Sequence, residues 1–249
     1  MIGQEKLTLF VENISKQDEI PVEINILLTG KAGIGKTYAI KYMANMFTKE
    51  PDLSDCIEHH PKFVNIELLQ RFDDVSLHIV DEVHKAENFE QFYDFMTTHL
   101  VIAGTNLPED LPEAFRSRCI NLVMENYSKE DLGRIVEVEY EFETNVIEDL
   151  VRRARGTPRD ILQMASLMKI NPETDLESLG YHLDGFRRED HLYIDYLEKV
   201  GASSLSRISA GTNLDSTLIQ EFVEPFLLEQ GMITITNRRK LNDGIKVQL

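Results

Sequence analysis

Short apolar runs alternate with helical patterns through the first half of the chain. Five of these runs have the length and apolar content of buried strands, at residues 24–29, 63–66, 77–81, 100–104 and 119–123. Apolar residues recur at helical spacing between the runs, as at Ala39, Ile40, Met43, Ala44 and Phe47. Strands that alternate with helices predict an α/β domain with a parallel five-stranded sheet.

The pattern changes after Met124 to helices alone. Residues 128–131 have the sequence of a capping box, which would open a first helix, and a second helix is expected at residues 144–155. Residues 156–158, Gly-Thr-Pro, then provide a helix stop, an N-cap and a proline at the first helical position. A third helix is therefore expected to follow directly, which predicts a small helical domain.

The last quarter of the chain predicts three helices and a β-hairpin. The helices are expected at residues 191–200, 204–210 and 215–230. Residues 232–236 alternate like a strand, Asn237 starts a turn, and residues 245–247 are expected to return as the partner strand. This order is typical of a winged helix, a helix-turn-helix variant common in DNA binding.

The composition indicates a globular protein. Of the 249 residues, 42% are hydrophobic, and no apolar run approaches the length of a membrane span, so no membrane partner is expected. The N-terminus lacks the charged-then-apolar pattern of a secretion signal, so a cytoplasmic location is expected. Cys56 and Cys119 lie far apart in the sequence and are expected as thiols rather than as a disulfide or metal ligands.

The net charge of −17 argues against a DNA-binding surface that covers the whole protein. Residues 1–186 hold 18 basic and 34 acidic side chains, whereas residues 187–249 hold 8 basic and 9 acidic ones. Contact with DNA is therefore expected at a local patch in the C-terminal quarter. Arg238, Arg239 and Lys240, at the predicted hairpin turn, are the candidates, although three cations at a turn are often only solvated. Four glutamates are expected to form a solvated face: Glu137, Glu139, Glu141 and Glu143.

A complete phosphate-binding loop, G-x-x-x-x-G-K-T, runs from Gly30 to Thr37 between a predicted strand and a predicted helix. Gly30, Gly33 and Gly35 let backbone N–H groups curl around a triphosphate, and the helix N-terminus adds partial positive charge. Lys36 is expected to reach the β- and γ-phosphates, and the Thr37 hydroxyl is expected to hold Mg²⁺. The loop predicts that the protein binds a nucleotide.

Two further strands end in polar side chains. Asp81 and Glu82 follow one of them; Asp81 would support the Mg²⁺ shell, and Glu82 would act as general base toward the water that attacks the γ-phosphate. Asn106 follows the strand at residues 100–104, whose tip is expected beside Asp81 at the carboxyl edge of the sheet. Asn106 would orient the attacking water or touch the γ-phosphate. The alternatives are a solvated acidic strand end and a turn asparagine.

Two arginines are candidates for contact with the γ-phosphate. Arg118, in Arg116-Ser117-Arg118-Cys119, could be inserted from a neighbouring subunit to neutralise charge during hydrolysis. Arg159 lies in the first turn of its predicted helix, where the helix dipole disfavours a cation and a bound phosphate would relieve that cost. A solvated arginine is the alternative interpretation of Arg159.

The order of these motifs resembles that of AAA+ ATPases. Within that class, the chain is similar over nearly its full length to the RuvB family of bacterial Holliday-junction branch-migration motors. Ile2-Gly3-Gln4 is similar to the family's adenine-side box, Asp81-Glu82-Val83-His84 to its Walker B motif, and Gly156-Thr157-Pro158-Arg159 to its sensor 2. The sequence Val-Glu-Pro-Phe-Leu-Leu-Glu-Gln-Gly at residues 223–231 resembles its third winged-helix helix.

The resemblance implies a P-loop AAA+ ATPase domain at residues 1–126, a helical lid at 127–187 and a winged-helix domain at 188–249. It further implies a hexameric ring that hydrolyses ATP with Mg²⁺ between subunits and moves duplex DNA, with Ile2 beside the adenine.

The chain departs from the RuvB pattern in two respects. That family has a β-hairpin between Walker B and sensor 1 through which it engages its junction-binding partner, whereas here a helix-like segment at residues 89–97 leaves no room for one. Asn106 and Ser117-Arg118-Cys119 look more like those of clamp-loader ATPases. An AAA+ loader or remodeller that acts on a protein partner is therefore the alternative function.

Overall fold

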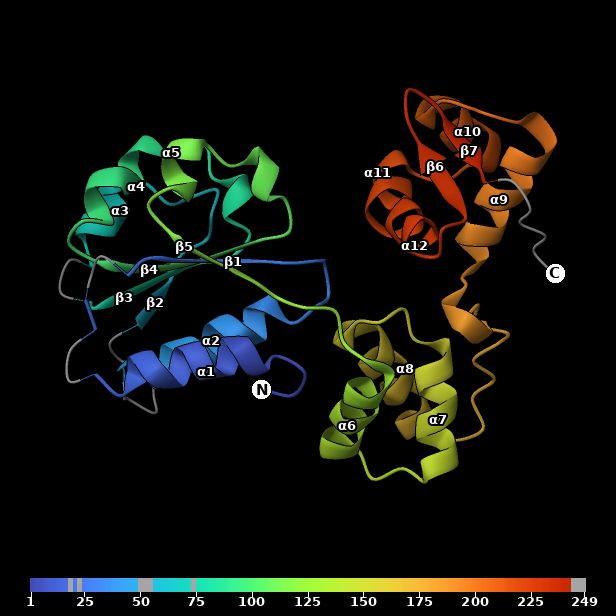
Figure 1. Ribbon diagram of the computed structural model, residues 1–249, viewed down its shortest axis with the longest axis horizontal. Helices are drawn as coiled ribbons and strands as arrows, with labels where there is room; N and C mark the ends of the chain where they lie inside the picture. Colours follow the sequence, from blue (N-terminus) through green and yellow to red (C-terminus); the bar gives the residue numbers. More distant parts are fainter. Residues whose placement is uncertain (18–19, 22–23, 49–55, 73–74, 243–249) are drawn as a thin grey trace. The chain divides into compact units, whose positions relative to one another are not determined.

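The computed structural model describes residues 1–17, 20–21, 24–48, 56–72 and 75–242. Contacts divide the chain into two units, residues 1–135 with 156–159 and residues 136–155 with 160–249. The first unit contains a five-stranded sheet, and the second contains helices and a two-stranded hairpin (Figure 1). Among the described residues, no helix combines the length and the apolar character that a membrane span requires.

The sheet of the first unit is parallel throughout, as predicted, in the order β2-β3-β4-β1-β5. Its strands are β1 (Ile26–Thr29), β2 (Cys56–Glu58), β3 (Leu77–Val80), β4 (Leu100–Thr105) and β5 (Ile120–Val123). Strand β4 lies between β1 and β3, with Thr29 opposite Thr105 and Val80 opposite Ala103. The carboxyl ends of β1, β3 and β4 therefore meet at one edge of the sheet.

Helices cover both faces of this sheet (Figure 1). Helices α1 (Glu5–Ser15) and α2 (Lys36–Thr48) pack on one face, and α3 (Ile66–Gln70), α4 (Glu90–Phe95) and α5 (Glu113–Arg116) pack on the other. Consecutive strand residues thus enter different cores: Ile26 and Leu28 pack with α1 and α2, whereas Leu27 packs with the opposite layer. This two-sided burial explains why the central strands are unbroken apolar runs in the sequence.

The prediction of a strand at residues 63–66 is wrong. Residue 66 begins α3 instead, because the Asn65 side chain accepts a hydrogen bond from the Leu68 N–H at 2.9 Å and caps that helix. The sheet is extended at this side by β2, which has 3 residues, none of them buried. A strand this short and only partly buried leaves no apolar run in the sequence.

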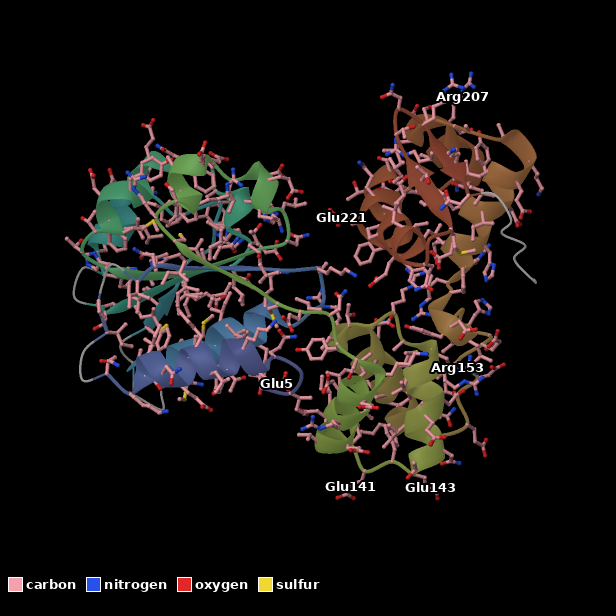
Figure 2. The ribbon with its side chains drawn as sticks, in the orientation of Figure 1. Glu5, Glu141, Glu143, Arg153, Arg207 and Glu221 are labelled. Atoms are coloured by element: carbon pink, nitrogen blue, oxygen red, sulfur yellow. The ribbon has the colours of Figure 1, made fainter. Side chains whose placement is uncertain are left out.

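The second unit begins within α6 (Lys129–Glu139) and continues through α7 (Thr144–Arg153) and α8 (Pro158–Ile170), close to the predicted helices. Glu137, Glu139, Glu141 and Glu143 are exposed, as expected for a solvated face. Figure 2 shows Glu141 and Glu143 pointing away from the ends of α6 and α7.

Three helical segments follow: α9 (Arg188–Val200), α10 (Leu205–Thr212), and a third that runs through α11 (Ser216–Leu218), the turn η4 (Ile219–Val223) and α12 (Glu224–Glu229). Asp215 caps the third segment by accepting hydrogen bonds from Thr217 N–H and Leu218 N–H. Turn η4 is π-helical. Its wider geometry has a local cause, because Pro225 has no N–H to donate to the Glu221 carbonyl four residues earlier.

The hairpin consists of β6 (Ile233–Ile235) and β7 (Arg239–Leu241), which pair antiparallel. The partner strand predicted at residues 245–247 lies outside the described residues, and the strand that pairs with β6 comes earlier. Ser203 forms a bridge with Arg239, so the start of α10 lies beside β7. Arg239 and Lys240 therefore belong to a strand, and Arg238 precedes it at the turn.

A network of ionic groups, with the buried Asp190 among them, joins α8 and the residues before it to the start of α9 within the second unit. The Arg155 guanidinium pairs with Asp190, which is fully buried, and donates to the Gly185 and Phe222 carbonyls at 2.9 and 3.0 Å. Arg187 pairs with Asp160 through two bonds of 2.8 and 3.0 Å. Removing one partner of such a pair leaves an unpaired buried charge.

Replacing Arg155 with Met removes the charge and keeps much of the side-chain length. The free energy of unfolding of the second unit should fall by about 3–5 kcal/mol, because Asp190 would remain buried without its ion-pair partner. Urea unfolding followed by circular dichroism measures the change. The matched control Arg152→Met, at an exposed position of α7, should change stability by less than about 0.5 kcal/mol. Equal effects of the two substitutions would contradict this account of the network.

Candidate nucleotide-binding site

The loop from Gly30 to Thr37 connects β1 to α2, as predicted. Gly33 has φ 77°, a left-handed conformation that suits glycine, and Gly30 and Gly35 also have positive φ. The Lys36 side chain is buried and its ammonium group donates to the Gly30 and Lys31 carbonyls at 2.9 and 3.0 Å. The loop thus folds around the amine that is predicted to reach the phosphates.

Charges around Lys36 come from three of the predicted site residues. Burial lowers the pKa of the Lys36 ammonium group, the Glu82 and Asp81 carboxylates raise this pKa in part, and the Arg159 guanidinium lowers it. Two cations and two carboxylates therefore meet at the loop. Phosphate oxygens placed between Lys36 and Arg159 would interact favourably with both cations.

The predicted metal ligands touch each other. Thr37 Oγ1 donates to Asp81 Oδ2 at 2.5 Å, which joins the start of α2 to the end of β3. Gly104 on β4 makes room for this carboxylate, because a Cβ there would lie 2.5 Å from Asp81 Oδ1 and 2.8 Å from Ile40 Cδ1. A hydroxyl and a carboxylate are hard oxygen donors of the kind that Mg²⁺ prefers, so the pair fits that ion.

Glu82 has a strained backbone, with φ 53° and ψ 41°. A non-glycine residue in this region is held at a cost of order 1–3 kcal/mol, and such residues cluster at functional sites. Its N–H donates to Asp81 Oδ1 at 2.9 Å, and its carboxylate Oε2 lies 3.5 Å from His84 Nε2 and 3.9 Å from Lys85 Nζ. The side chain is 40% exposed, so water can reach it.

Asn106 directly follows β4, and β4 is the strand that pairs with β3. Its Oδ1 is buried and has no hydrogen-bond partner among the described residues. A buried amide atom without a partner is unusual in a folded protein and requires a physical explanation. An acceptor in this position is suited to a water hydrogen, which agrees with the predicted role of Asn106.

Arg159 reaches the loop from the start of α8. Its N–H donates to the Gly33 carbonyl at 3.3 Å, and a Cβ at Gly33 would lie 3.2 Å from Arg159 Cβ and 3.3 Å from Thr157 Oγ1. The chain therefore brings the Gly-Thr-Pro-Arg turn to the phosphate-binding loop, where Gly33 leaves space for it. Arg159 is exposed.

The first residues of the chain pack close to the loop. Gln4 is buried and exchanges two hydrogen bonds with the backbone of Glu125, at 2.8 and 3.0 Å. A Cβ at Gly3 would lie 2.9 Å from the Tyr127 ring, and one at Gly35 would lie 3.8 Å from the Tyr127 hydroxyl. Ile2 lies in the turn before Gly3, partly buried, and its contact with adenine stays a prediction.

The sequence alone did not assign roles to several residues at the site, namely Gln4, His84, Gly104, Thr105 and Tyr127. Gln4 and His84 lie inside motifs that the sequence showed, but neither motif says what the side chain contacts. The need for Gly104 arises only from the approach of two strands, which no local pattern encodes.

Arg118 is exposed and follows α5. Its guanidinium lies over the Tyr93 ring, 4.5 Å from the centroid, and donates to the Ala114 carbonyl at 2.6 Å. These contacts hold the arginine at the surface of its own subunit. Its role toward a neighbouring subunit stays a prediction.

The three predicted DNA-binding cations differ in their surroundings. Arg239 pairs with Glu224 at 2.8 Å, and Glu224 also accepts from the Tyr193 hydroxyl at 2.9 Å. Glu224 is buried, so Arg239 neutralises a buried carboxylate inside the domain. Arg238 and Lys240 are exposed. Arg239 is thus held in an ion pair within its own domain, and the DNA contacts of all three residues stay predictions.

The fold and the site together define a class. A P-loop strand lies between β4 and β5, carboxylates follow β3, a polar residue follows β4, and an arginine at the start of a later helix contacts the loop. This arrangement is that of the AAA+ proteins.

Comparison with known proteins shows a narrower likeness. The family described as RuvB C-terminal winged helix domain matches residues 183–244. The Holliday junction branch migration complex subunit RuvB of Campylobacter hominis is 24% identical to this chain, and the match covers 96% of this chain and 84% of the relative. The subunit of the same name from Orientia tsutsugamushi is 25% identical, and the match covers 96% of this chain and 89% of that relative. The Thermotoga maritima RuvB Holliday junction branch migration motor has the same fold, with a TM-score of 0.75, 21% identity and coverage of 97% and 93%. The chain is RuvB-like over nearly its full length.

Proposed function

We propose that this chain is a ring-forming AAA+ ATPase that couples ATP hydrolysis to the movement or remodelling of DNA. The observation that carries the proposal is the contact of Arg159 with the phosphate-binding loop, in a chain whose likeness to RuvB extends into the winged helix. The names of those relatives describe Holliday-junction branch migration. We therefore propose DNA as the substrate of this chain.

In this proposal, groups of the loop and of the strand ends carry out the hydrolysis. The Lys36 amine leaves the Gly30 and Lys31 carbonyls for the β- and γ-phosphates. Mg²⁺ held by Thr37 and Asp81 would neutralise phosphate charge. Glu82 takes a proton from the attacking water, and Asn106 Oδ1 accepts its other hydrogen. The water oxygen bonds to the γ-phosphorus as the bond to the bridging oxygen breaks, and that oxygen leaves with ADP.

Two arginines act on the γ-phosphate in this proposal. Arg159 belongs to the same chain as the loop and approaches it through Gly33. Arg118 serves a neighbouring subunit, because it is exposed and held by Tyr93 and Ala114 on its own chain. An arginine supplied in trans makes hydrolysis depend on assembly, which agrees with a hexameric ring.

Charge supports a DNA contact through the wing rather than the third helix. The segment from residue 208 to residue 237 contains no lysine or arginine. Its exposed Glu221 would repel phosphate, and Figure 2 shows Glu221 and Arg207 on different sides of the winged helix. Arg238 and Lys240 therefore provide the attraction in this proposal.

One observation favours a partner different from that of the RuvB family. The stretch from Asp81 to Asn106, which is described throughout, contains the turn η1 (Val83–Lys85) and α4 but no β-hairpin. A DNA motor without the family's junction-binding partner agrees with this departure. Remodelling of a protein partner receives less support, because the likeness to RuvB continues through the winged helix.

Changing Lys36 to Ala should abolish nucleotide binding, whereas Glu82→Gln should leave ATP bound but not hydrolysed. The amide cannot take the water proton, yet Thr37 and Asp81 remain to hold the ion. Fluorescent-nucleotide titration and phosphate release measure the two steps. Wild-type turnover by purified Glu82→Gln protein would remove Glu82 from its role.

Mixing inactive Arg118→Ala subunits with inactive Glu82→Gln subunits should restore part of the ATP hydrolysis. Mixed rings would contain interfaces in which an intact Glu82 meets an intact Arg118. Loss of an arginine finger costs about 10³–10⁵ in rate in well-studied enzymes, so partial recovery is easily measured. Arg116→Ala, at the exposed end of the helix α5 that Arg118 follows, is the matched control and should stay active alone. Mixed rings verified by mass without recovered activity would show that Arg118 does not act in trans.

Replacing Arg238 and Lys240 together with Ala should weaken binding to all DNA sequences alike. The slope of log affinity against log salt should flatten by about two, since each neutralised phosphate contributes about 0.9. Arg188→Ala with Lys199→Ala removes the same charges from exposed positions of α9 and should leave more of the slope intact. Equal slopes for wild type and the wing variant would place DNA elsewhere.

A further inference from the structure

His84 links the end of β4 to the carboxylate of Glu82. It lies in the turn η1, directly after the Asp81-Glu82 pair, and its side chain is 10% exposed. Its Nδ1 is 2.9 Å from Thr105 Oγ1, and its Nε2 is 3.5 Å from Glu82 Oε2. One imidazole ring therefore contacts both the strand that leads to Asn106 and the predicted general base.

The hydrogen bonds around Thr105 indicate which group donates and which accepts between Thr105 and His84. Thr105 is fully buried on β4, and its Oγ1 accepts the Leu107 N–H at 3.0 Å. A hydroxyl has one hydrogen to donate, and a buried hydroxyl needs an acceptor for it. His84 Nδ1 is at the distance to serve as that acceptor, and a ring hydrogen is then placed on Nε2, which faces Glu82.

The same bonds enclose Asn106. Thr105 and Leu107 flank it in sequence, and the bond from Leu107 N–H to Thr105 Oγ1 closes a tight turn around it. A shift of Asn106 toward a γ-phosphate would move both flanking groups. The Thr105 hydroxyl would then carry the shift to His84.

Glu82 is the last residue in the series of contacts that runs from Thr105 through His84. His84 and Lys85 both approach Oε2, so Oε1 is the oxygen placed to take a proton from water. The left-handed backbone of Glu82 limits how its side chain can be directed. An N–H donor on Oε2 would hold the carboxylate in one orientation.

We propose that His84 is a positioning residue for Glu82 and that Thr105 fixes its tautomer, so that the state of Asn106 sets the orientation of the catalytic carboxylate. This inference rests on the proposed role of Glu82 in ATP hydrolysis. It assigns to His84 and Thr105 an effect on the chemical step, with little effect on nucleotide binding.

Thr105→Val tests the link because it removes the hydroxyl and keeps the shape of the side chain. The kcat for ATP hydrolysis should fall about 10–100-fold, the range in which loss of an orienting partner lowers activity at metal sites. The KM and the affinity for ATP should change less than about threefold, since neither residue contacts the loop in this proposal. Thr105→Ser, which restores the hydroxyl, should recover most of the rate.

A double-mutant cycle with His84→Ala separates the link from general damage to the strand. If Thr105 acts through His84, Thr105→Val should reduce kcat no further once His84 is Ala. Full additivity of the two losses would overturn the proposal, as would a wild-type kcat in His84→Ala alone. The kcat of His84→Ala alone can be measured even if Thr105→Val does not fold.

The wild-type and Glu82→Gln proteins separate this proposal from the proposed function. No ATP hydrolysis by the wild-type chain would refute the function itself. Hydrolysis that requires Glu82 but is unchanged in both His84→Ala and Thr105→Val would refute only the link.

Discussion

The nucleotide site depends on how closely the carboxyl ends of β1, β3 and β4 approach one another. The approach is possible because Gly104 has no side chain, since a Cβ there would lie 2.5 Å from Asp81 Oδ1. That space lets Asp81 reach the Thr37 hydroxyl on α2 and accept the Glu82 N–H. The strained turn at Glu82 follows, and it places His84 against Thr105. A side chain at position 104 would therefore disturb the predicted metal ligands and the predicted general base together.

A second constraint concerns the segment that carries Arg159. The chain leaves the second unit after Arg155 and returns to it at Asp160, and the four residues between them belong to the first unit. Both flanking residues are fixed within the second unit: the Arg155 N–H donates to Asp160 at 2.8 Å, and Asp160 pairs with Arg187 at the start of α9. Within the second unit, Asp160 thus holds the start of α8 to the start of α9 through an ion pair. The Arg239–Glu224 pair has a similar role inside the winged helix, and it shows that a cation near the wing can serve the fold rather than DNA.

Much of this arrangement was predictable from the sequence, and the failures have physical causes. Four of the five strands, the phosphate-binding loop and the helices of the second unit follow from apolar runs, glycine spacing and helix caps, because each is encoded within a few residues. Strand β2 could not be predicted because it is short and only partly buried. The strand expected at residues 63–66 is absent because Asn65 caps helix α3 there. The pairing of Arg239 with Glu224 and the bond between His84 and Thr105 join positions 15 and 21 residues apart. No local pattern specifies such contacts, so the sequence showed the residues but not their partners.

The measurement that tests the central claim most directly is the rate of ATP hydrolysis by the purified chain, alone and with linear duplex, single-stranded and four-way-junction DNA. The account predicts hydrolysis that requires Lys36 and Glu82 and that increases when duplex or junction DNA is added. A rate that is the same with and without every form of DNA would contradict a DNA motor. It would leave an ATPase whose substrate is a protein. Absence of hydrolysis under all conditions would contradict the enzymatic assignment itself.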